Sequence, residues 1–81
     1  MRNTTDLKHL LEENKDKFQF LMFFTFFPDK EDGKFWDIGI MRRKEDNESE
    51  LVSGLSGDNM YVLVDQTCKN IEEYIKNKGK E

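Results

Sequence analysis

The sequence of 81 residues predicts one α+β domain, a two-layer sandwich in α-β-β-β-α order, with a three-stranded antiparallel meander and both helices on one face. Three observations predict this fold. Apolar residues recur at helical spacing near both ends of the chain, aromatic and apolar runs of strand periodicity lie between them, and polar turns separate the runs. A chain this short buries only roughly 60 to 65% of its unfolded surface, so residues 1–81 form a single domain with one small core.

The first helix is predicted over residues 5–16. The candidate N-cap oxygens lie ahead of its apolar stripe, on Thr4, Thr5 and Asp6. The apolar stripe that it buries consists of Leu7, Leu10 and Leu11.

The first strand is predicted over residues 18–27, which read FQFLMFFTFF. Alternate residues of a strand point to opposite faces, and here both faces are largely apolar. Some of these residues also fit a helical stripe that continues from Leu7 and Leu11, but the density of aromatic residues favours a strand.

The second strand is predicted over residues 35–43, as the antiparallel partner of the first. Pro28 cannot donate to a strand ladder, and Gly33 in the polar stretch PDKEDGK can adopt the positive φ of a turn. Gly39 leaves room for a Phe across the strand pair. One face of this strand is expected to carry Trp36, Ile38 and Ile40, and the other Phe35, Asp37, Gly39 and Met41.

A charged turn, RRKEDNESE, precedes a short edge strand, ELVSGLS, which Gly54 and Gly57 are expected to limit. The last segment favours one long helix, capped by Asp58 or Asn59 and ended near Gly79. Its stripe consists of Tyr61, Val64, Cys68, Ile71 and Ile75. The alternative is a fourth strand over residues 60–64, followed by a helix that starts near Gln66.

The residues that carry chemistry do not form a recognisable constellation, so we expect no enzyme and no cofactor. His9 and Cys68 are the only histidine and cysteine, and no sequence signature surrounds either. One His and one Cys do not make a zinc site, and DKEDG and EDNESE lack the order of EF-hand ligands. We therefore expect no metal.

The net charge of −4 and the pI of about 5.0 disfavour binding to nucleic acid or to an anionic membrane and favour basic partners. The apolar run of residues 18–27 is too short to span a bilayer as a helix. The single cysteine and an N-terminus without the features of a signal peptide predict a cytoplasmic protein.

The α-β-β-β-α order resembles that of the double-stranded-RNA-binding domain. That family contacts phosphates through a basic start to its second helix. The corresponding stretch here is GDNMYVLVDQ, which is acidic and apolar, so the resemblance is one of element order and we expect no direct nucleic-acid binding.

Two helices can cover one face of a small sheet but not both, so part of the aromatic run is expected to form a protein interface. We expect binding to a second copy, by edge pairing of ELVSGLS or by stacking of two sheets, in a regulator, immunity-type binder or inhibitor. The expected interface residues are Leu21, Phe23, Phe27, Trp36, Ile38 and Ile40. If the helices cover the other face, the set becomes Phe20, Phe24, Phe35 and Met41. The competing interpretation places all these side chains in one irregular core.

The alternative function is mimicry of a nucleic-acid backbone, by which the protein would block a basic nucleic-acid-binding protein. Phage-encoded inhibitors of nucleases or of CRISPR effectors are of this type. The negative charge is concentrated in two loops that a meander places at opposite ends of the sheet. The acidic residues expected to contact such a partner are Asp29, Glu31, Asp32, Glu45, Asp46 and Glu48.

Overall fold

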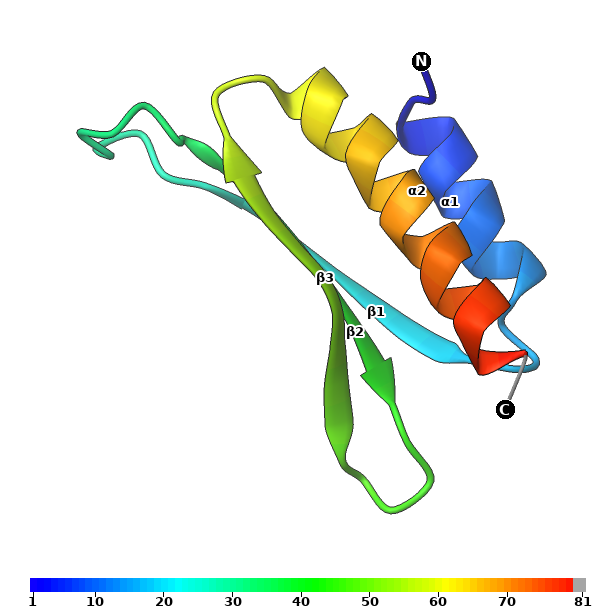
Figure 1. Ribbon diagram of the computed structural model, residues 1–81. Coiled ribbons are helices and arrows are strands. Elements are labelled where there is room, and N and C mark those ends of the chain that lie inside the picture. Colours follow the sequence, from blue (N-terminus) through cyan, green and yellow to red (C-terminus); the bar gives the residue numbers. More distant parts are fainter. Residues whose placement is uncertain (80–81) are drawn as a thin grey trace.

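The computed structural model describes residues 1–79 and confirms the predicted fold class (Figure 1). Three antiparallel strands form one sheet in the order β1-β2-β3, and two helices pack on it. The elements are α1 (Thr4–Glu13), β1 (Gln19–Phe26), β2 (Trp36–Arg43), β3 (Ser49–Gly57) and α2 (Met60–Lys78).

Helix α1 begins one residue earlier than predicted because Asn3 caps it. The Asn3 Oδ1 accepts a hydrogen bond from the Asp6 N–H at 3.0 Å, and the Asp6 carboxylate accepts one from the Asn3 N–H at 2.8 Å. This reciprocal capping box satisfies donors that the first turn would otherwise leave unpaired. The helix ends at Glu13 rather than near residue 16. Directly after it, the Asn14 side chain donates a hydrogen bond to the carbonyl of Leu10 at 2.8 Å.

Helix α2 is continuous from Met60, so the alternative of a fourth strand over residues 60–64 is wrong. Asn59 caps the helix by accepting hydrogen bonds from two backbone N–H groups of its first turn. The predicted stripe is correct from Val64 onward, but Tyr61 is 68% exposed and Leu63 takes its place against the sheet. The buried residues of α2 are Leu63, Val64, Thr67, Cys68 and Ile71.

The β1–β2 hairpin forms as predicted, with a regular antiparallel register. Phe24 lies opposite Ile38, and Phe23 lies opposite Gly39, where an added Cβ would lie 3.9 Å from the Phe23 Cβ, an ordinary contact distance. Strand β3 is longer than the predicted edge strand by one residue at each end, and it ends at Gly57, one of the two glycines expected to limit it. Its pairing with β2 contains one irregularity, next to Ile40.

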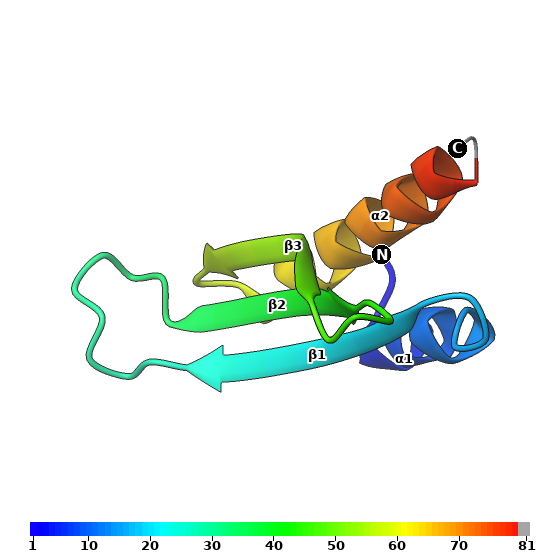
Figure 2. The ribbon, with the colours of Figure 1, turned by 90° about the horizontal axis from the view of Figure 1, so that it is seen from below.

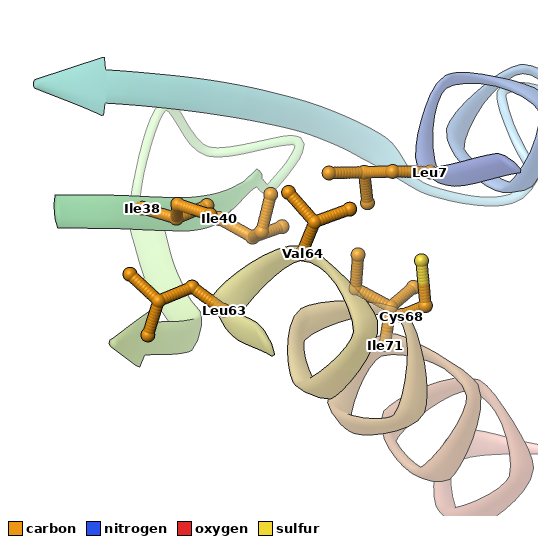
Figure 3. Close-up of a cluster of buried hydrophobic side chains, with 7 residues drawn as sticks. All are labelled: Leu7, Ile38, Ile40, Leu63, Val64, Cys68 and Ile71. Carbon is orange, nitrogen blue, oxygen red and sulfur yellow. The ribbon is translucent and has the colours of Figure 1, made fainter. Parts of the chain in front are cut away.

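The hydrophobic core lies between α1, α2 and the middle of β2 (Figure 3). Its fully or nearly fully buried apolar side chains are Leu7, Ile38, Ile40, Leu63, Val64, Cys68 and Ile71. None of these comes from β1. The β1–β2 loop, residues 27–35, projects away from both helices (Figure 2). The helix layer therefore covers one face of β2 and β3 along their length, from Gly57 to Glu50, and most of β1 lies beyond it.

Candidate protein-binding surface

Strand β1 is apolar on both faces, and the structure leaves both faces accessible. The register with β2 places its even-numbered residues on the helix side of the sheet, because they lie opposite the buried Ile38 and Ile40. The odd-numbered residues lie on the face that no helix covers. A strand of this position would ordinarily alternate apolar and polar residues, and β1 does not.

On the helix side, the helices contact only the beginning of β1. The rings of Phe18 and Phe20 lie 5.8 and 6.3 Å from the ring of Tyr74 on α2, and Phe18 is buried. Beyond Phe20 the strand leaves the helix layer. Three further side chains on this side are exposed, with Met22 at 43%, Phe24 at 38% and Phe26 at 52%.

The half-buried Trp36 supports the end of this exposed row. Its ring centroid lies 4.6 Å from that of Phe26 and 6.2 Å from that of Phe24. Offset and edge-to-face aromatic contacts of this kind stabilise a ring pair beyond the area that they bury. The exposed rings are therefore held in place by contacts within the hairpin, without a covering helix.

On the open face, Phe23 is the most exposed of the β1 side chains at 55%. Leu21 on the same strand is 36% exposed, and Phe27, which follows β1, is 39% exposed. We call the six exposed apolar side chains of this segment the β1 aromatic surface. They are Leu21, Met22, Phe23, Phe24, Phe26 and Phe27.

The predicted interface set mixed two faces of the sheet. Ile38 and Ile40 are fully buried beneath the helices, so their prediction as exposed interface residues is wrong. The antiparallel register explains the error, because it pairs them with Phe24 and Met22, whereas Phe23 lies opposite Gly39. A sequence that is apolar on both faces of β1 gives no periodicity from which this pairing could be read.

The remaining members of that set divide between the two faces. Leu21 and Phe23 are exposed on the open face, and Trp36 lies on the helix side, half-buried against Phe24 and Phe26. Of the alternative set, Phe24 is exposed while Phe20, Phe35 and Met41 are partly buried. The accessible surface thus takes residues from both predicted sets, and its binding role stays a prediction.

The acidic residues named from the sequence are all exposed and lie in two loops at opposite ends of the sheet. One group, on residues 44–48, borders a pocket of about 560 Å³ between the β2–β3 turn and the α1–β1 connection. The charged residues that line this pocket are Lys15, Asp16, Lys17, Arg42, Arg43, Lys44, Glu45 and Asp46. The chain fold thus brings Lys15 and Lys17 close to Arg42, Arg43 and Lys44, which are consecutive in the sequence. Cations predominate here, which works against a continuous acidic strip.

The two residues considered for nucleophilic chemistry differ in accessibility. His9 is exposed on α1, while Cys68 is fully buried on α2, and burial raises the pKa of its thiol. A raised pKa disfavours the thiolate, which is the nucleophilic form. Among residues 1–79, no three His, Cys, Asp or Glu side chains gather in a way that could hold a metal ion.

Comparison with protein-family models, with curated proteins and with solved structures finds no match to this chain. No helix in the part of the chain that the structure describes is long and apolar enough to cross a membrane.

Proposed function

We propose that the protein is a non-enzymatic protein-binding domain that associates with a second copy of itself through the β1 aromatic surface. The observation that carries the proposal is the exposure of six large apolar side chains along one edge strand, on both of its faces. Large contiguous apolar patches on a folded domain mark interaction sites, because leaving them in water is unfavourable.

The exposed area is large enough to matter energetically. A Phe side chain can bury about 150–250 Å², so the four partly exposed rings together present on the order of 400 Å² to water. At about 25 cal/mol per Å², burying half of that area in each of two copies contributes on the order of 10 kcal/mol. Association costs about 4–15 kcal/mol in lost freedom. The free energy gained by burying the ring surface is therefore comparable with this cost.

The positions of Cys68 and His9 favour a role in binding over one in nucleophilic catalysis. The buried Cys68 lies within the core cluster beneath α2, and the exposed His9 lies on α1. A nucleophile needs an adjacent base and access to substrate, and a buried thiol with a raised pKa does not meet the second condition.

Light scattering on a size-exclusion column, across a concentration series at neutral pH, tests the proposal. We expect a dimer mass that falls toward that of the monomer on dilution. Phe23→Ala should raise the dimer dissociation constant by about tenfold or more, because truncating a central aromatic anchor typically costs over 1 kcal/mol. Circular dichroism should show an unchanged fold, since Phe23 is more than half exposed.

Tyr61→Ala is the matched control, because Tyr61 is also an exposed aromatic residue but lies on the first turn of α2, away from β1. We expect its dissociation constant to equal that of the wild type. A monomer mass at every concentration, or equal losses in the two variants, would contradict the proposal.

A further inference from the structure

The hydrogen-bonding pattern of the sheet shows which backbone groups of β1 point away from β2. The Phe27 N–H donates to the Phe35 carbonyl at 2.7 Å, and this pair continues the β1–β2 register. At the other edge of β2, the Lys44 N–H donates to the Glu48 carbonyl at 2.8 Å, which turns even-numbered β2 residues toward β3 and odd-numbered ones toward β1. Both observations agree. The β1 residues whose N–H and C=O groups point outward are Phe20, Met22, Phe24 and Phe26.

This outward edge lacks every common protection against strand pairing. Edge strands are ordinarily blunted by charged residues, proline, bulges or a covering element. Residues 18–27 include no charged residue and no proline, the β1–β2 register is unbroken, and the helices contact only the beginning of β1. The edge is therefore a regular, apolar template for another strand.

The pattern of outward groups is symmetric about Phe23, which indicates the partner. An antiparallel copy of β1 that is centred on Phe23 brings Met22 opposite Phe24 of the second copy and Phe20 opposite its Phe26. This register uses all four outward-pointing residues of each strand, whereas a shift in either direction leaves some of them unpaired. No like charges meet, because the paired segment has none.

We propose that β1 pairs antiparallel with β1 of a second copy, about a twofold axis at Phe23, to form one continuous six-stranded sheet. This inference rests on the proposed self-association and specifies its geometry. Both helix layers then lie on the same side of the sheet, since a strand pair of this kind keeps its faces. On the open face the two Phe23 rings become direct neighbours.

The charge distribution is consistent with the same register. The second copy's β1 ends beside the beginning of the first copy's β1, so its β1–β2 loop arrives at the end of the sheet where the basic pocket lies. That loop carries three acidic residues, Asp29, Glu31 and Asp32, and two basic ones, a net charge of −1, while the five basic side chains of the pocket outnumber its three acidic ones, a net charge of +2. Opposite charges thus meet at both ends of the twofold pair, which favours this arrangement over one that brings like ends together.

A cysteine at the axis tests the pairing directly. In Phe23→Cys, the two introduced residues face each other at a position that is not hydrogen-bonded, where Cα atoms lie about 4.5 Å apart, within reach of a disulfide. The control is Leu21→Cys on the same face. Its two copies are offset by four residues, about 13 Å along the strands, which is beyond disulfide reach.

Under mild oxidation, we expect a covalent dimer from Phe23→Cys at least about tenfold faster than from Leu21→Cys. The wild type, whose Cys68 is fully buried, sets the background. Because Phe23→Cys also removes a ring of the β1 aromatic surface, both variants are oxidised at concentrations where light scattering shows each of them to be a dimer. Under those conditions, equal cross-linking of the two variants, or no cross-linking of Phe23→Cys, overturns the edge pairing and leaves self-association standing. A wild-type monomer at all concentrations overturns both proposals.

Discussion

The two edges of the sheet are protected to very different degrees. Strand β3 is fastened to α2, because the Ser53 hydroxyl accepts a hydrogen bond from the Asn70 side chain at 3.0 Å and the Glu50 carboxylate accepts one from the Tyr74 hydroxyl at 3.2 Å. Its pairing with β2 is also irregular next to Ile40. Strand β1 has an unbroken register, no charged side chain and, past its first residues, no helix beside it.

This difference follows from where two short helices can lie on a three-stranded sheet. The core gathers around the middle of β2, and α2 reaches from there over β3. Six of the seven Phe residues lie on or directly beside the strand that remains, in residues 18–27. One edge strand, β3, thus carries the polar contacts with α2, and the other, β1, carries the aromatic surface. The proposed self-association requires one unprotected edge of this kind.

The largest expected effect is on the free energy of unfolding, when a substitution in the covered core is compared with one on the exposed strand β1. Ile71→Ala, at a fully buried position of α2, should lower the free energy of unfolding by about 2–5 kcal/mol, because it leaves a cavity in the core. Phe24→Ala should cost the monomer less than Ile71→Ala, because 38% of the Phe24 side chain is already exposed in the folded state. Urea unfolding at concentrations where both variants are monomeric measures the difference.

The rate at which the Cys68 thiol is alkylated tests the same prediction independently. Cys68 is fully buried and its pKa is raised by burial, so an alkylating reagent reaches it mainly when the helix layer opens. Ile71→Ala should speed alkylation by about 30-fold or more, since each 1.4 kcal/mol is tenfold in population. Phe24→Ala should raise the rate less than Ile71→Ala does. Equal rates in the two variants would show that β1 shares the core.

An effect of intermediate size is expected on the dimer dissociation constant when a charge is placed on each edge strand in turn. Met22→Lys puts a cation at the edge of β1 that we propose pairs, and should raise the dimer dissociation constant by about tenfold or more. Leu51→Lys makes the same change at an exposed apolar position of β3, and should leave association unchanged. Light scattering on both variants decides. A greater loss with Leu51→Lys would move the interface to β3, the edge used in one of the two dimer arrangements expected from the sequence.

The order of elements could be predicted because each one has its own local signal. The helical stripe from Val64 to Ile75 and the cap at Asn59 are both readable without knowledge of the tertiary structure. These signals depend on spacing along a single segment, and the structure confirms the elements that they indicate.

The composition of the exposed surface could not be predicted in the same way. Which face of β2 is buried depends on where α2 lies, and β1 is apolar on both faces, so its own pattern does not identify the covered side. The sequence interpretation therefore grouped Ile38 and Ile40 with Phe23, although the register separates them. The partial cover of β1 was missed for a related reason, since nothing local indicates that the helices stop near Phe20.

The smallest expected effect concerns the ion pairs of Glu50 on β3. The Glu50 carboxylate lies 3.1 Å from the Lys44 ammonium and 3.9 Å from that of Lys78. The hydrogen bond from Lys44 is the main cause that lowers the pKa of Glu50 below its ordinary value. A group whose pKa is lower in the folded state stabilises the fold above its unfolded-state pKa, and that contribution is lost as the pH falls through the folded value.

Wild type should therefore be more stable than Glu50→Gln at pH 6, and the difference should shrink as the pH falls below about 4, the ordinary range of a Glu carboxyl. Urea unfolding of both proteins at a series of pH values measures the difference, and the effect is small because the group is partly solvated. Glu73→Gln, at an exposed position of α2, is the control and should track the wild type. If Glu50→Gln also runs parallel to the wild type at every pH, the ion pairs do not fasten β3. The protection of that edge would then come from α2 packing and the irregular β2–β3 pairing alone.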